Sequence, residues 1–260
     1  MKLISKLIPN NIKQIIAIII NYIYPRNIVC IICDNPIKLT NSYSLCRSCF
    51  KELVFILDGC NKCGKPIINR NLERESLIQC NYCFNKTFYF GKVISCIEYD
   101  DISKKLILDF KYKNKTYLCR YIAYLMKEKI LLENIKFDYI LFVPLHKKRM
   151  KQRGFNQSEK IADKLGELLD IPVLDCIDRV KNTKKLYRLN KKDREKELKN
   201  GFKVKENINL IKNKKVILID DIFTTGATAN EISKILKINL VNNICIFTLL
   251  TTCADVYLKE

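Results

Sequence analysis

The sequence predicts an α/β domain with a largely parallel, doubly wound sheet, preceded by a small cysteine-rich module. In the C-terminal two-thirds of the chain, short apolar runs alternate with segments whose apolar residues recur at helical spacing, and this alternation is typical of βαβ units. In the first third, eight cysteines form four Cys-x-x-Cys pairs. A chain of 260 residues can hold one ordinary domain and a small module. We therefore expect a lead-in over residues 1–29, the module over 30–90 and the α/β domain over 91–260.

The lead-in contains an apolar run over residues 12–23. Lys13, Gln14 and Asn21 interrupt this run, so it is too short and too polar to span a bilayer. No small-residue cleavage site follows it, so a secretory signal is not expected either. We expect a short helix that packs on the body of the protein, and a helix lying on a membrane surface is the alternative that the flanking lysines favour. The cytoplasm is the expected compartment.

The cysteine-rich module carries a metal-ligand pattern. Its pairs are Cys30/Cys33, Cys46/Cys49, Cys60/Cys63 and Cys80/Cys83. Two such pairs supply the four thiolates of a closed tetrahedral site, so the eight cysteines predict two structural Zn²⁺ ions. Disulfides and iron–sulfur clusters are the alternatives, and the missing secretory signal and the even two-residue gaps favour zinc over both. Spacers of 12 and 16 residues favour sites built from consecutive pairs, with interleaved pairing left open.

The first elements of the α/β domain follow from periodicity. A strand is expected over residues 92–99, helices over 102–110 and 117–132, and a second strand over 139–144. The second strand leads into a loop rich in cations, from His146 to Arg153, and Asn156 then caps a helix. If the strands lie in one parallel sheet, this basic loop faces the crevice at their carboxyl ends, where open α/β sheets bind ligands.

The rest of the domain contains the most informative segment of the chain. A strand is expected within residues 172–180, and residues 181–199 form a long, charged connection typical of a mobile lid or a nucleic-acid contact surface. Residues 216–228 then combine four apolar residues, Asp220 and Asp221, and a loop of small residues that turns into a helix near Thr228. A strand over 243–250 follows.

The segment 216–228 suits a phosphorylated ribose. Ionised Asp220 and Asp221 can accept hydrogen bonds from ribose hydroxyls, and a helix start supplies converging donors for a phosphate. The expected phosphate-binding residues are Thr224, Thr225, Gly226, Ala227 and Thr228. The segment resembles the phosphoribosyl-diphosphate (PRPP) loop of type I phosphoribosyltransferases. This resemblance implies a type I phosphoribosyltransferase-like domain, Mg²⁺ that accompanies PRPP, and a basic loop that receives the pyrophosphate. The candidates in that loop are His146, Lys147, Arg149 and Arg153.

The chain as a whole is similar to the ComF family of bacterial competence proteins, which join a zinc-ribbon region to a phosphoribosyltransferase-like domain. The motifs that carry this resemblance are Tyr24-Pro25, Phe110-Lys111-Tyr112, Val143-Pro144-Leu145, Arg153-Gly154-Phe155-Asn156-Gln157 and the segment from Asp220 to Thr228. The resemblance implies a PRPP-binding site and a role in handling single-stranded DNA during natural transformation. It implies a competence helicase as a partner and a cytoplasmic protein, with a peripheral position at the membrane beside the DNA-uptake machinery as an option.

Two side chains depart from the family pattern, because Leu186 and Glu197 stand where it has a glutamine and an asparagine. Ligand binding is therefore a firmer expectation than turnover. An active nucleobase or amine phosphoribosyltransferase, in salvage or regulation unrelated to DNA uptake, is the alternative function. The formal net charge of +20 points to anionic partners, although the abundant Lys, Asn and Ile are also typical of an adenine- and thymine-rich genome.

Overall fold

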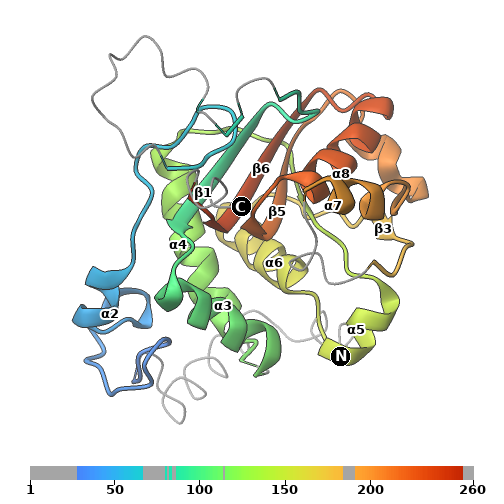
Figure 1. Ribbon diagram of the computed structural model, residues 1–260. Coiled ribbons are helices and arrows are strands. Elements are labelled where there is room, and N and C mark those ends of the chain that lie inside the picture. Colours follow the sequence, from blue (N-terminus) through green and yellow to red (C-terminus); the bar gives the residue numbers. More distant parts are fainter. Residues whose placement is uncertain are drawn as a thin grey trace, which may run out of the picture. The chain divides into compact units, whose positions relative to one another are not determined.

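The computed structural model describes residues 28–66, 80, 82–83, 86–113, 115–183 and 191–253 (Figure 1). The expected lead-in helix and Leu186 lie outside the described residues. The chain forms two compact units, residues 1–52 and 53–260. Within the described residues of the small unit, the regular elements are the 3₁₀ turn η2 (Ser42–Ser44) and the helix α2 (Arg47–Glu52). Among the described residues, no helix combines the length and the apolarity needed to cross a membrane.

The larger unit is built on a four-stranded parallel sheet. Its strands are β1 (Lys92–Glu98), β2 (Tyr139–Phe142), β5 (Lys215–Phe223) and β6 (Asn243–Thr251), in the order β1-β6-β5-β2. All four strands are apolar and buried along most of their length, as parallel strands covered on both faces require. The expected α/β class with a parallel sheet is confirmed.

Helices cover both faces of this sheet (Figure 1). On one face lie α3 (Asp101–Tyr112), α4 (Leu118–Leu132) and α6 (Gln157–Leu169). On the other face, α8 (Ala227–Ile238) packs Ile232 and Leu236 against Val216 and Leu218 of β5, and α7 (Lys191–Leu198) lies beside α8. Because side chains alternate along a strand, Val216, Leu218 and Asp220 share one face of β5 and Ile217, Ile219 and Asp221 share the other.

Two segments differ from the sequence-based expectation. The basic segment after β2 is a short helix, α5 (Lys147–Arg153), and not a loop. The His146 side chain caps its start, and Gly154 ends it with a φ of 81°, a conformation that glycine adopts without strain. The strand expected within 172–180 is limited to β3 (Ile177–Arg179), which pairs antiparallel with β4 (Phe202–Val204) in a separate sheet, followed by the 3₁₀ segment η5 (Glu206–Ile211).

The second cysteine group belongs to the larger unit. Cys60, Cys63 and Cys83 are buried in the same core as Phe90 and Val93. The sequence places both cysteine groups in one module ending at residue 90, whereas the contacts separate them at residue 52. The physical reason is that the second group contributes apolar surface to the core of the α/β domain, and the first group stands in the small unit.

Candidate functional site

Asp220 and Asp221 are adjacent near the C-terminal end of β5, and both carboxylates reach the start of α6, where Ser158 bonds to Asp220 and Gln157 bonds to Asp221. Asp220 is partly exposed and lines an open pocket. Asp221 is 6% exposed, and it is not among the described residues that line this pocket. Instead, Asp221 Oδ2 forms an ion pair with Lys111 Nζ of α3 and accepts a hydrogen bond of 3.0 Å from Gln157 Nε2 of α6. The two neighbouring carboxylates therefore have different surroundings.

Burial and the neighbouring charge of Asp221 together raise the pKa of Asp220 to about 7. The Lys111 ammonium and the Ser158 hydroxyl, which donates to Asp220 Oδ1 over 3.3 Å, act in the opposite direction. Asp220 thus changes its charge near neutral pH, whereas a free aspartate changes it near pH 4. The sequence-based reasoning assumed that both carboxylates stay ionised, and for Asp220 this holds only above about pH 7.

The loop after β5 forms the other wall of the pocket, which Thr224, Thr225, Gly226, Ala227 and Thr228 all line. Gly226 has a φ of +75°, and a Cβ placed there would lie 2.7 Å from Cζ of Phe223. Glycine is therefore required on both backbone and steric grounds. Ala227 begins α8, and its N–H donates to Thr225 Oγ1 over 3.4 Å. The structure brings this loop together with Asp220 at one edge of the sheet.

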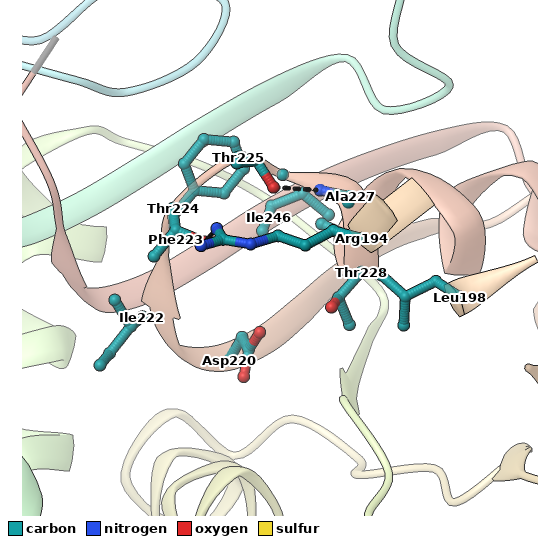
Figure 2. Close-up of a pocket in the computed structure, with 12 residues that line it drawn as sticks. Arg194, Leu198, Asp220, Ile222, Phe223, Thr224, Thr225, Ala227, Thr228 and Ile246 are labelled. Atoms are coloured by element: carbon teal, nitrogen blue, oxygen red, sulfur yellow. Dashed lines mark hydrogen bonds between the residues drawn. The ribbon is translucent and has the colours of Figure 1, made fainter. Parts of the chain in front are cut away.

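Arg194 of α7 completes this pocket (Figure 2). Figure 2 shows its side chain extending across the loop towards Thr224, and its Nη1 donates to Thr224 Oγ1 over 3.4 Å. The N-terminus of α8, the threonine hydroxyls and this guanidinium are all suited to an anion. The sequence-based reasoning did not single out Arg194, because it is one cation among many in the charged connection.

A second group of cations is formed by Arg149 and Arg179, and the Arg179 charge interacts with that of Asp220. Arg179, at the end of β3, donates from Nη2 to the hydroxyl of Thr183 over 2.6 Å. Arg149 of α5 donates from Nη2 to the carbonyl oxygen of the same residue over 3.0 Å. Arg179 is 7% exposed, and its Nε has no hydrogen-bond partner among the described residues. Burial and the charge of Arg149 lower the pKa of Arg179 to about 10, and the negative charge of Asp220 partly offsets this. Two guanidinium groups held this close favour an anionic ligand.

Of the four basic residues expected to bind pyrophosphate, Arg149 is the one that belongs to the Arg149–Arg179 pair. His146 Nδ1 accepts the N–H of Lys148 over 3.2 Å and so caps α5, and Lys147 is exposed. Arg153 donates to Gln157 Oε1, and its guanidinium lies 5.3 Å from the ring centroid of Tyr112. The sequence-based reasoning missed Arg179, because a single arginine in a short strand carries no local signal of its position in the fold.

The eight predicted zinc ligands form two groups, Cys30, Cys33, Cys46, Cys49 and Cys60, Cys63, Cys80, Cys83. In each group all four Sγ atoms lie within 4.8 Å of one another, and individual Sγ–Sγ distances range from 3.4 Å to 3.8 Å. Four thiolates at about 2.3 Å from one ion stand roughly 3.8 Å apart in a tetrahedron, so the cysteines fit zinc. Consecutive pairs thus form each site, which resolves the pairing that the sequence left open.

The two cysteine groups begin with the same turn. Cys30 N–H donates to Asn35 O over 2.8 Å, and Cys60 N–H donates to Lys65 O over 2.9 Å. The residue in the left-handed conformation is Asp34 in the first turn and Gly64 in the second. A Cβ at Gly64 would lie 2.7 Å from the carbonyl oxygen of Val93, so glycine lets the second turn pack directly against β1.

Lys65 connects this second turn to the edge of the sheet that carries the pocket. Its side chain is fully buried, and its Nζ donates to the carbonyl and to the hydroxyl of Thr252, both over 2.7 Å. The same ammonium lies 4.5 Å from the ring centroid of Tyr82 and 6.0 Å from that of Phe223. Phe223 immediately precedes the loop from Thr224 to Thr228, so the second cysteine group supports the strand ends from which this loop starts.

Known proteins resemble this chain both in the cysteine-rich region and over most of its length. The family described as a double zinc ribbon domain matches residues 19–85. Competence protein F of Haemophilus influenzae is 30% identical over 217 residues, covering 81% of this chain and 91% of its own. Competence protein ComFC of Bacillus subtilis is 26% identical over 232 residues, covering 78% of this chain and 86% of its own. The DNA utilization protein YhgH of Salmonella typhimurium is 25% identical, covering 81% and 91%.

Among solved structures, an adenine phosphoribosyltransferase from Thermoanaerobacter pseudethanolicus covers 54% of this chain and 83% of its own, with 12% identity and a TM-score of 0.33.

Proposed function

Because this chain belongs to the ComF family of competence proteins, we propose that it binds PRPP, or another ligand that contains ribose 5-phosphate, and acts in the uptake of single-stranded DNA. The observation that carries this proposal is one pocket lined both by Asp220 and by the loop from Thr224 to Thr228. A carboxylate that accepts hydroxyl hydrogen bonds and a loop that donates to a phosphate match the two ends of a ribose 5-phosphate.

In this proposal, Asp220 accepts a hydrogen bond from a ribose hydroxyl. The loop N–H groups and the hydroxyls of Thr225 and Thr228 hold the 5-phosphate, and Arg194 covers it from α7. Arg179, whose charge interacts with that of Asp220, and Arg149, which bonds to the same threonine as Arg179, hold the pyrophosphate of PRPP. Mg²⁺ would arrive with PRPP, because this ion prefers phosphate oxygens and water with one or two carboxylates, and it would neutralise pyrophosphate charge. Asp220 is the carboxylate that could approach it.

The proposed role of Arg179 in binding pyrophosphate is tested with the whole ligand and with its two parts as separate ligands. Calorimetry with Mg-PRPP, with ribose 5-phosphate and with Mg-pyrophosphate separates binding in the pocket from binding at the Arg149–Arg179 pair. We expect Arg179→Gln to weaken Mg-PRPP and Mg-pyrophosphate by about 10- to 100-fold, the loss of a charge-assisted hydrogen bond, and to leave ribose 5-phosphate unchanged. Arg120→Gln, which removes an arginine of α4 that lies over Tyr124, is the control. Equal losses for all three ligands would show a general effect on folding instead.

The DNA part of the proposal predicts a strong salt dependence. Single-stranded DNA binding through Lys and Arg releases counterions, and the logarithm of the affinity should fall with the logarithm of the salt concentration by about 0.7 per phosphate contact. Fluorescence anisotropy with a labelled oligonucleotide between 50 and 200 mM salt, the range over which this effect is usually compared, measures the slope. A flat response would remove the electrostatic basis for DNA binding, whatever the outcome with PRPP.

An active phosphoribosyltransferase is the second candidate function, favoured by the Arg149–Arg179 pair, which suits pyrophosphate as a leaving group. Such an enzyme would break the bond between the ribose and the pyrophosphate of PRPP and join the ribose to a nucleobase or an amine. Pyrophosphate release, screened across nucleobases, amines and DNA ends, distinguishes the two candidates. Release that depends on a free base and is indifferent to DNA would favour a role in salvage.

A further inference from the structure

Three sequence motifs that are far apart in the chain meet at the C-terminal end of β5. The last residues of α3, Phe110 to Tyr112, lie against the segment from Arg153 to Gln157. The ring centroids of Phe110 and Phe155 are 5.5 Å apart, and the Arg153 guanidinium lies 5.3 Å from the Tyr112 ring. These two contacts flank Lys111 on either side, and Lys111 reaches the third motif at Asp221.

The Lys111–Asp221 ion pair is shielded from solvent on both sides. The Lys111 side chain is 15% exposed and the Asp221 side chain is 9% exposed. Gln157 donates to the same carboxylate oxygen, Oδ2, over 3.0 Å, and it in turn accepts from Arg153. A charge in such surroundings is stable only with its partner, so removing either member alone leaves the other poorly compensated.

We propose that Lys111 is a positioning residue, which holds Asp221 as its counter-ion on the face of β5 away from the pocket and leaves Asp220 as the carboxylate that meets the ribose. This inference rests on the proposed function and deepens it. It assigns different roles to two adjacent aspartates that the sequence presents as equivalent. It also gives the Phe110-Lys111-Tyr112 motif a purpose in the ligand site, although none of its residues lines the pocket.

The charge balance of the site explains why this lysine matters. Two ionised carboxylates on adjacent residues repel each other, and an anionic ligand adds to the repulsion. The Lys111 ammonium neutralises the charge of Asp221 without occupying the pocket. The groups that act on Asp220 electrostatically are Asp221 beside it on β5, Lys111 on α3, Ser158 on α6 and Arg179 on β3, and Arg194 on α7 lines the same pocket.

A double-mutant cycle tests this assignment. We expect Lys111→Met and Asp221→Asn each to weaken Mg-PRPP by about 10- to 100-fold, because each leaves one buried charge without its partner. In the double variant both charges are gone, and the affinity should return to within about fivefold of the wild type. Lys111→Met alone should also move the pH midpoint of binding upwards, because Asp220 loses a neighbouring positive charge. A purely structural role for Lys111 would leave that midpoint in place.

The control is Lys113→Met, which removes a lysine from the same end of α3. Lys113 pairs with Asp109 at 2.8 Å, and its side chain is 60% exposed, so its loss should leave both the affinity and the pH midpoint unchanged. If the wild type binds Mg-PRPP and the double variant does not, Asp221 itself contacts the ligand and the inference is wrong. If the wild type binds no Mg-PRPP or ribose 5-phosphate, the proposed function fails, and this inference fails with it.

Discussion

Asp220→Asn should weaken the binding of Mg-PRPP by about 10- to 100-fold. It should also abolish the part of the pH dependence of this affinity that comes from the ionisation of residue 220. The carboxylate is the acceptor in the pocket, and an amide oxygen is a weaker acceptor for a ribose hydroxyl. In the wild type, burial and the charge of Asp221 place the pKa of Asp220 at about 7. The wild-type affinity should therefore rise by about tenfold in total between pH 6 and pH 8, as the ionised fraction of Asp220 increases.

Calorimetry across this pH range gives the measurement, and comparison with Asp220→Asn cancels the ionisation of the ligand's own phosphates. The stability of the free protein should change in the opposite sense. Because the folded-state pKa is raised above the unfolded value of about 4, the folded protein favours the protonated acid, so stability is lost as the pH rises from about 4 to about 7 and does not fall further above that. Asp220→Asn should thus raise the unfolding temperature at pH 8. A variant that binds as tightly as the wild type would remove Asp220 from the ligand site.

Loss of the second zinc site should destabilise the α/β domain, whereas loss of the first should not. Cys60→Ser removes a ligand that is buried in the core of the larger unit. Structural zinc contributes its binding free energy directly to folding. We expect the unfolding temperature of the larger unit to fall by about 10 °C or more, which corresponds to several kcal/mol for a domain of this size. Binding of Mg-PRPP should weaken as well, because Lys65 connects this site to Thr252 and Phe223.

Cys30→Ser is a closely matched control for this experiment. Cys30 and Cys60 are each the first ligand of their group, both are buried, and both donate a backbone hydrogen bond to the residue five positions later. Each variant should reduce the zinc content from two ions to one, as measured by atomic absorption. Cys30 belongs to the small unit, so the larger unit should keep its unfolding temperature. Equal losses for the two variants would contradict the assignment of the second site to the core.

Local patterns were enough to locate most of the elements. The apolar residues of β5, the helical spacing of α4 and the cap at Asn156, whose side chain accepts from Ser158 N–H, all depend on residues close in sequence. The end of β5 could not be predicted in this way. The strand continues through both aspartates to Phe223 because β6 pairs with it to that point, with Asp220 opposite Thr248 and Phe223 opposite Thr251. Strand length is set by the partner, and the partner lies elsewhere in the chain.

The sequence alone determined which chemical groups are present in this protein: eight cysteines at zinc-ligand spacing, two adjacent carboxylates, and a loop with glycine where a left-handed conformation is needed. Tertiary structure decided how they are used. In the folded chain Asp220 lines the pocket, and Asp221 forms an ion pair with Lys111. Arg179 lies beside Arg149, and the second zinc site is part of the core. The reason is physical, because spacing and periodicity act over a few residues, whereas burial, charge pairing and ligand geometry depend on segments that meet only when the sheet and its helices pack together.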